Sequence, residues 1–245
     1  MTGSIHDAVE MPIREAILDA HLRTWQRIAN AGTWFDGPAR VAIAAESRNA
    51  SACALCAERK AALSPYVVDG THDSRGDLPE AIVEIVHRII TDPPRIRKQW
   101  YEGILADGMA DTEYVEVVGV VCSTVLVDTF ARSMGAPIPD LPAPESGEPS
   151  RQRPDGVKPG LAWVPWIAPE DAKEPEADLY AQGTSNIYRA LSSVPDEKRG
   201  FFELVDAQYL SGNKIRDFGT EHRAITRPQI ELVAGRVSAL NQCVY

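Results

Sequence analysis

The sequence has little positive charge for its size. Its 245 residues include 25 Lys and Arg against 35 Asp and Glu, which gives a formal net charge of −10 at pH 7. A surface of that sign repels the phosphate backbone of nucleic acids. We therefore expect no nucleic-acid partner.

Long apolar runs and an export signal are also lacking. The longest apolar stretch, residues 115–130, is interrupted by Glu116 and Asp128 and is shorter than the ~20 residues that a membrane-spanning helix needs. The first residues do not show the basic segment followed by an apolar one that a secretory signal requires. We therefore expect a cytoplasmic protein without a membrane partner.

Cysteine is scarce, with four in the chain. In a chain that is not exported these thiols stay mostly reduced, so a framework of structural disulfides is not expected. Cys53 and Cys56 form a C-x-x-C motif, which indicates redox or metal chemistry. The alternative is a pair of small apolar core residues, since free cysteine is often buried. Zinc needs four ligands at short spacings, and Cys122 and Cys243 are too scattered to complete such a set. No phosphate-binding loop or dinucleotide fingerprint is present, and nothing indicates haem or flavin, so we expect no metal and no cofactor.

What the sequence does contain is helical periodicity. No stretch shows sustained alternation with a period of two, so the expected fold class is all-α. The apolar spacing and the helix start and stop signals predict helices over residues 10–31, 37–63 (with an interruption at 49–51), 78–91, 95–107, 112–134, 185–193, 198–210 and 227–240.

Residues 136–176 differ from the rest because they hold ten of the eighteen prolines, so that neither a helix nor a central strand can persist there. Trp163 and Trp166 argue against a free linker, which would leave both indoles in water. We expect an extended strap over a helical surface or a neighbouring subunit. The predicted organisation is a first helical domain over 1–135, a Pro-rich strap over 136–184, and the start of a second domain over 185–245.

The closing segment resembles an earlier one. Superposing Cys243 on Cys53 needs no gap, and Ser51 then matches Asn241, both of a type that favours helix N-caps. We expect each cysteine in the first turn of a helix, where unpaired N–H groups and the helix dipole favour the thiolate. The second copy stops at Tyr245, before a second cysteine. We therefore expect the native product to continue past Tyr245. A cropped sequence, a frameshift or a stop codon read as selenocysteine would each explain the missing continuation.

At these residues the chain resembles the alkylhydroperoxidase D / carboxymuconolactone decarboxylase superfamily, and more narrowly its double-domain peroxidase-related members. The family motif is a Glu, a Cys twelve residues on, then x-x-Cys and a His four residues later. Glu231 and Cys243 have the first spacing, and Tyr245 occupies the aromatic-or-His position between the cysteines. In the first copy the C-x-x-C is complete, but Val41 stands in place of the Glu and Lys60 in place of the His.

The resemblance implies a duplicated, all-α, AhpD-like helical bundle that assembles as a trimer or hexamer with its active site beside a subunit contact. It implies a thiol-dependent peroxidase in which Cys56 attacks a small hydroperoxide and Cys53 resolves the sulfenate as a disulfide. A Glu–His relay moves protons, and a thiol or dithiol reductant protein restores the pair. The decarboxylase branch of the family lacks the cysteine pair and acts on a lactone.

The relay residues that the first copy lacks have candidates elsewhere. Glu116 could supply the acid from a neighbouring helix, and the alternative is a carboxylate at the edge of the core bonded to an Arg. His87 could take the histidine role, and the alternative is a core histidine on an apolar helix. Glu231 would serve a completed second module if it is buried. The alternative for Glu231 is an exposed helical residue paired with Arg227.

Three functions stay open at this point. The leading one is a peroxidase-like oxidoreductase that uses Cys53 and Cys56 and, in the complete protein, Cys243 with its missing partner. The second is a catalytically reduced member whose helices mainly build an assembly, which the substitutions at Val41 and Lys60 favour. The third is a lactone decarboxylase-like enzyme that does not use its thiols, which the intact C-x-x-C opposes.

Overall fold

Helices dominate the computed structural model, which describes residue 9, residues 11–241 and residue 243, and this confirms the all-α class. The helices are α1 (Glu15–Ala29), α2 (Gly37–Asn49), α3 (Ala54–Ala61), α4 (Glu80–Thr91), α5 (Lys98–Ala106), α6 (Asp111–Ser133), α7 (Asn186–Arg189), α8 (Pro195–Gln208), α9 (Gly212–Arg216) and α10 (Arg227–Leu240). Two short strands, β1 (Val157–Lys158) and β2 (Trp166–Ile167), pair antiparallel.

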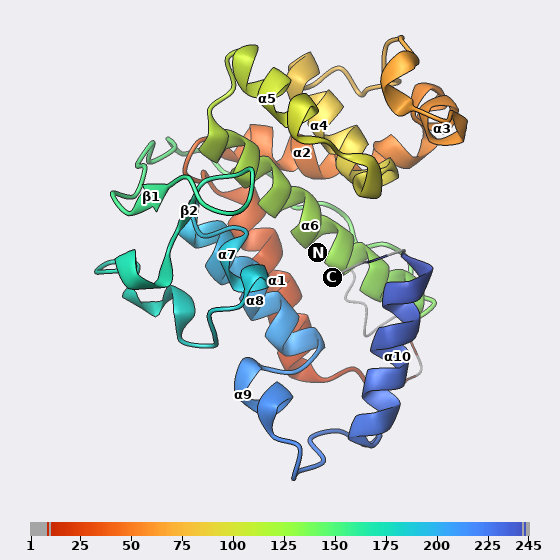
Figure 1. Ribbon diagram of the computed structural model, residues 1–245. Coiled ribbons are helices and arrows are strands. Elements are labelled where there is room, and N and C mark those ends of the chain that lie inside the picture. Colours follow the sequence, from red (N-terminus) through yellow and green to blue (C-terminus); the bar gives the residue numbers. More distant parts are fainter. Residues whose placement is uncertain (1–8, 10, 242, 244–245) are drawn as a thin grey trace.

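The core is organised around α6, which crosses the middle of the molecule (Figure 1). It packs against α2 and α4 on one side and against α1 and α8 on the other, with Val117, Val120 and Val121 fully buried. Within the described part of the chain, α6 is also the one helix long and apolar enough to cross a membrane. Because 67% of its most apolar window is buried among the other helices, we interpret it as a core helix.

The segment that carries the C-x-x-C follows its sequence signals closely. The Asp36 side chain accepts a hydrogen bond from the Ala39 backbone N–H at 2.8 Å, and Pro38 lies in the first turn of α2. The predicted interruption at 49–51 is confirmed, because the chain tightens there into a 3₁₀ turn, Ala50–Ala52, before α3 begins. This turn redirects the chain so that the cysteines face α4.

Several helix limits differ from the prediction. The first helix begins at Glu15 rather than near residue 10, and α8 begins at Pro195, because proline is well suited to a first helical turn. The helix expected over 185–193 is the single turn α7, and α9 was not expected. Although residues 185–245 were assigned to a second domain, α8 packs on α1 and α6 and contributes Leu204 to the main core.

The Pro-rich segment lies as a strap over the helices. The backbone N–H of Glu145 donates to the Ala29 carbonyl at 2.8 Å, and that of Arg151 donates to the Thr33 carbonyl at 2.7 Å. Ile167 of β2 is buried. The expectation that both indoles are covered is wrong for Trp163, which is 48% exposed.

The last helix, α10, has the limits predicted for it and lies at the edge of the molecule (Figure 1). In the ungapped sequence alignment of Cys243 with Cys53, the first residue of α10 is aligned with the first residue of α2, and both helices carry a proline in the first turn. Their surroundings differ. Ile230 is the buried residue of α10, whereas α2 packs against α1, α4 and α6.

Candidate functional site

The C-x-x-C lies at the beginning of α3. Cys53 is the N-cap residue of that helix and Cys56 lies in its first turn, so the helix begins two residues later than a cap at Ser51 predicts. Cys243, for which a first-turn position was also expected, follows the end of α10 and lies in no helix. Asp73 fixes this end of the helix, because its carboxylate accepts the Ala54 N–H at 2.7 Å and its own N–H points to Cys53 Sγ at 3.4 Å. Both cysteines are free thiols, 2% and 4% exposed.

Two histidines from different parts of the chain meet the sulfurs. His72, from the loop between α3 and α4, has its Nδ1 3.4 Å from Cys56 Sγ and 3.6 Å from Cys53 Sγ. His87, from the middle of α4, has its Nδ1 3.3 Å from Cys56 Sγ. The four donor atoms all lie within 4.8 Å of one another. Cys56 is therefore held between two imidazole rings.

A carboxylate of α2 lies behind His87. The Nε2 atom of His87 is 2.7 Å from Oε1 of Glu46, and both side chains are fully buried. Glu46 also accepts hydrogen bonds from the Asn49 side chain at 2.9 Å and from the Arg75 backbone at 3.0 Å. These donors outweigh the cost of burial and lower the pKa of Glu46. The carboxylate stays ionised and orients the ring of His87.

The second histidine has a matching partner. His72 Nε2 is 2.7 Å from Glu84 Oε2, and Glu84 also accepts hydrogen bonds from Arg59 at 2.8 Å and from the Trp100 indole at 2.9 Å. Burial alone would raise the pKa of Glu84, but these three donors lower it to about 2. Each imidazole thus bridges a carboxylate and a sulfur.

This arrangement favours a thiolate. Burial opposes ionisation of the Cys56 thiol, but hydrogen bonds with His72 and His87 prevail and lower its pKa to about 6. Burial likewise opposes protonation of the histidines, and contacts with Cys56 and the carboxylates raise the pKa of His72 to about 10 and raise that of His87. Near neutral pH, Cys56 and His72 therefore form a thiolate–imidazolium pair.

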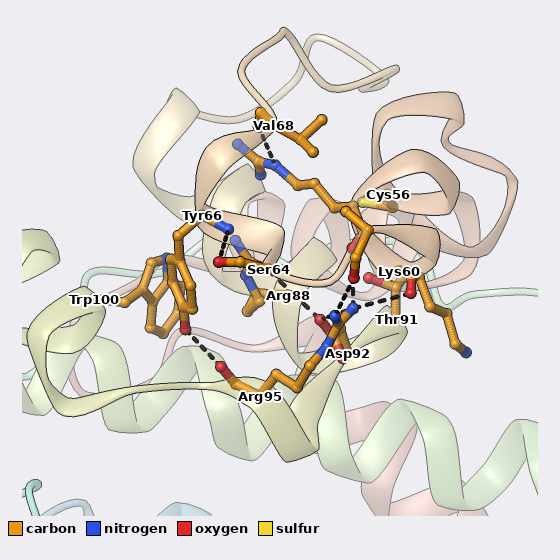
Figure 2. Close-up of polar contacts among 12 residues, drawn as sticks. Cys56, Lys60, Ser64, Tyr66, Val68, Arg88, Thr91, Asp92, Arg95 and Trp100 are labelled. Carbon is orange, nitrogen blue, oxygen red and sulfur yellow. Dashed lines mark hydrogen bonds and ion pairs between the residues drawn. The ribbon is translucent and has the colours of Figure 1, made fainter.

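Arg95 anchors the C-terminal end of α3 by hydrogen bonds (Figure 2). A narrow recess lies nearby, next to Cys56. Arg95 donates to the carbonyl oxygens of Ala62 at 2.8 Å and Arg59 at 3.0 Å, and its Nε donates to Asp92 at 2.9 Å. The recess lies between Cys56, Arg59, His72, Arg88, Thr91 and Asp92 and is too narrow for a water molecule. Lys60, at the position of the family histidine, is exposed and points away from Cys56.

Glu116 lies in a different cluster. It forms an ion pair with Arg40 and accepts the Trp34 N–H at 2.6 Å, while Arg40 also contacts Glu197 at 2.7 Å. Glu197 in turn pairs with Arg27 at 2.5 Å. Burial raises the pKa of Glu116, with Glu197 adding to the effect against the pull of Arg40. Glu116 lies in this arginine cluster and not among the residues around the cysteines, so the acid role predicted for it is not supported. The structure has the alternative, a carboxylate bonded to an Arg.

Of the residues predicted for the second copy, Glu231 and Cys243 are exposed. The Glu231 side chain is 51% exposed and pairs with Arg227 at 2.6 Å, four residues earlier, which is the alternative arrangement. Cys243 is exposed, and Tyr245 lies outside the described residues.

The partly buried Cys122 has a pKa raised to about 11 by burial and by the Glu197 carboxylate, so it is a poor nucleophile.

Sequence reasoning found His87 but missed Glu46, His72 and Glu84. One signal was present, because Glu84-x-x-His87 places a carboxylate and an imidazole on one face of an apolar helix, as in carboxylate–histidine metal motifs. His72 sits in an irregular loop without periodicity, and no local pattern pointed to it. The expectation of no metal site counted only cysteines, whereas the structure gathers two cysteines and two histidines.

No family model, curated protein or solved structure matches this chain. The resemblance to the alkylhydroperoxidase D superfamily therefore stays a prediction from the sequence.

Proposed function

We propose that this protein is a thiol-dependent oxidoreductase that reduces small hydroperoxides with the Cys53–Cys56 pair. The observation that carries the proposal is the position of Cys56 Sγ, 3.3 and 3.4 Å from two imidazole nitrogens that are each backed by a carboxylate. Such a cluster supplies a nucleophile, a proton donor and a second thiol. The common start of α2 and α10 also supports the duplicated, AhpD-like arrangement.

The first chemical step follows from the contacts of Cys56. Its thiolate attacks one oxygen of the hydroperoxide, the O–O bond breaks, and Cys56 becomes a sulfenic acid. The departing alkoxide takes the proton that His72 carries on the nitrogen facing the sulfurs. Glu84, on the other side of the ring, stabilises the imidazolium before transfer and fixes the ring's direction.

The second step uses the neighbouring thiol. His72, now neutral, accepts the proton of the Cys53 thiol, 3.6 Å away. The Cys53 thiolate attacks the Cys56 sulfur, the S–O bond breaks, and the departing hydroxide takes the proton back from His72 as water. The products are a disulfide, an alcohol and water. A dithiol reductant then restores both thiols by thiol–disulfide exchange.

Burial limits the substrate class that this site can take. Because the recess beside Cys56 has no room for a water molecule, entry of any peroxide requires the recess to open. A small opening admits hydrogen peroxide or a short alkyl hydroperoxide more readily than a bulky lipid hydroperoxide. We therefore propose the small members of this class as substrates.

The test is consumption of hydrogen peroxide by the full chain with a dithiol as reductant, compared among three proteins. Cys56→Ser should abolish thiol-dependent consumption, because a serine hydroxyl at this position cannot give two electrons to the peroxide. Cys122→Ser, which changes a thiol outside the cluster, should keep the wild-type rate. Equal rates for wild type and Cys56→Ser would remove the proposed function.

A further inference from the structure

We propose that the reduced cluster of Cys53, Cys56, His72 and His87 is a binding site for one Zn²⁺ ion. Two thiolates and two imidazoles are the donor set that zinc prefers in closed tetrahedral sites. The four ligand atoms come from the start of α3, the following loop and α4, and they lie within 4.8 Å of one another. The metal site stands on this geometry alone; its regulatory consequence rests on the proposed function.

The distances between donors fit a tetrahedron around zinc. With Zn–S near 2.3 Å and Zn–N near 2.0–2.1 Å, tetrahedral angles put a sulfur and a nitrogen roughly 3.6 Å apart. Three of the four sulfur–nitrogen separations are 3.3, 3.4 and 3.6 Å, and all four donor atoms lie within 4.8 Å of one another. A metal ion at the centre therefore needs little movement of the side chains.

The outer contacts also suit a metal. Both histidines present Nδ1 to the sulfurs and Nε2 to a carboxylate, Glu84 for His72 and Glu46 for His87, each at 2.7 Å. A zinc-bound histidine characteristically donates its other N–H to such a carboxylate, which fixes the tautomer and the direction of the ring. The backbone N–H of Asp73 points to Cys53 Sγ at 3.4 Å and would stabilise a bound thiolate.

Zinc in this position would control the thiols. With four protein ligands and both cysteines nearly sealed from solvent, no coordination position is open, so bound zinc slows attack on a peroxide. When a hydroperoxide does oxidise the pair, it takes two electrons from the two thiolates. With two protons it becomes an alcohol and water. The sulfurs join as a disulfide, and Zn²⁺, having lost two ligands, leaves.

The first experiment measures metal binding by the full chain after reduction and removal of metals. Titration with Zn²⁺ against a chromophoric chelator should show one tight site per chain. Co²⁺ in its place should give the visible bands of a tetrahedral ion and thiolate-to-cobalt charge transfer in the ultraviolet. Absence of a stoichiometric site, or octahedral cobalt without charge transfer, would overturn the proposal.

Variants locate the site. Cys53→Ser should remove the tight site and its charge-transfer band, whereas His21→Gln, which changes a buried histidine outside the cluster, should keep both. If Cys53→Ser has lost its helical circular dichroism, Glu84→Gln serves instead, because it keeps all four ligands and should weaken zinc binding about 10–100-fold. Unchanged affinity in a folded Cys53→Ser or Glu84→Gln protein would overturn the proposal.

The final arm separates this inference from the proposed function. Hydrogen peroxide should release one Zn²⁺ for each disulfide formed, and one equivalent of zinc should suppress peroxide consumption until a chelator is added. Peroxide consumption that zinc does not change would overturn the metal inference and leave the peroxidase intact. Stoichiometric zinc at these four residues in a protein that consumes no peroxide would support the metal site and overturn the peroxidase.

Discussion

The two helix–cysteine segments of this chain begin alike and end in different surroundings. α2 leads to Cys53 and Cys56, which are buried beside two histidines. α10, whose first residue aligns in sequence with the first residue of α2, leads to the exposed Cys243. The difference comes from what packs on each helix: α4 and the loop before it bring the histidines to the first segment, and Leu232 on α10 is 75% exposed. The reactivity of a cysteine motif therefore depends on the elements that pack over it.

The charged residues of the two helices show the same contrast. Glu46 and Arg40 of α2 are fully buried, and each is joined to residues far along the chain. Glu231 of α10 is half exposed and is paired within its own helix. Buried charges depend on their partners for stability, whereas exposed pairs contribute little.

The largest expected effect is on stability. Arg40→Leu leaves Glu116 without its ion-pair partner and Glu197 with only Arg27, so the free energy of unfolding should fall by about 3–5 kcal/mol. In α10, Glu231→Gln removes an exposed i,i+4 pair and should cost about 0.5 kcal/mol or less. Urea unfolding followed by circular dichroism measures both. Similar losses for the two variants would contradict the contrast between the helices.

The next effect is on activity. Glu46→Gln replaces the carboxylate behind His87 with an amide, which cannot balance the charge of an imidazolium, so less Cys56 is thiolate and peroxide consumption near pH 7 should fall about 10-fold. The pH profile of the remaining activity should move upward, because the weaker imidazolium raises the pKa of the Cys56 thiol. A loss of activity with an unchanged pH profile would show that Glu46 acts only on the fold. Glu231→Gln should keep the wild-type rate.

The third effect concerns pH. In reduced, chelator-treated protein the pKa of Cys56 near 6 means that the thiolate is present above that pH and is lost as pH falls through it. Cys122, with a pKa near 11, remains protonated across the same range. The ultraviolet absorbance of thiolate, taken as the difference between wild type and Cys56→Ser, should rise with a midpoint near pH 6. A midpoint near the ordinary thiol value would mean that the histidines do not stabilise the thiolate.

The smallest effect is expected in the second segment. Cys243→Ser should leave peroxide consumption unchanged, because in the described part of the chain the buried histidines and carboxylates gather around Cys53 and Cys56. A marked loss of activity in this variant would place the reacting thiol in the second segment and reverse the comparison.

The sequence predicted most of the fold because helix signals are local. Asp36-Gly-Pro38 marked the start of α2, the polar residues at 49–51 marked its end, and α10 has the predicted limits. α9 and the exposure of Trp163 could not be predicted, because they depend on how distant segments pack.

The candidate site was predictable only in part, for the same reason. The C-x-x-C and His87 carried local signals, a motif and a histidine on an apolar helix. Glu46 is a carboxylate on a helix of mixed polarity, and His72 belongs to an irregular loop, so their meeting with Cys56 depends on the packing of α2, α3 and α4. Glu116 is a candidate in the sequence because it interrupts an apolar run, but its carboxylate pairs with Arg40 instead.

The central claim is that Cys53 and Cys56 together give two electrons to a hydroperoxide and are joined as a disulfide. The most direct measurement is mass spectrometric mapping of the reduced, metal-free protein after one equivalent of hydrogen peroxide. The account predicts a disulfide between Cys53 and Cys56, with Cys122 left as a thiol. Both cluster thiols unmodified under excess peroxide, or oxidation confined to Cys122 or Cys243, would contradict it.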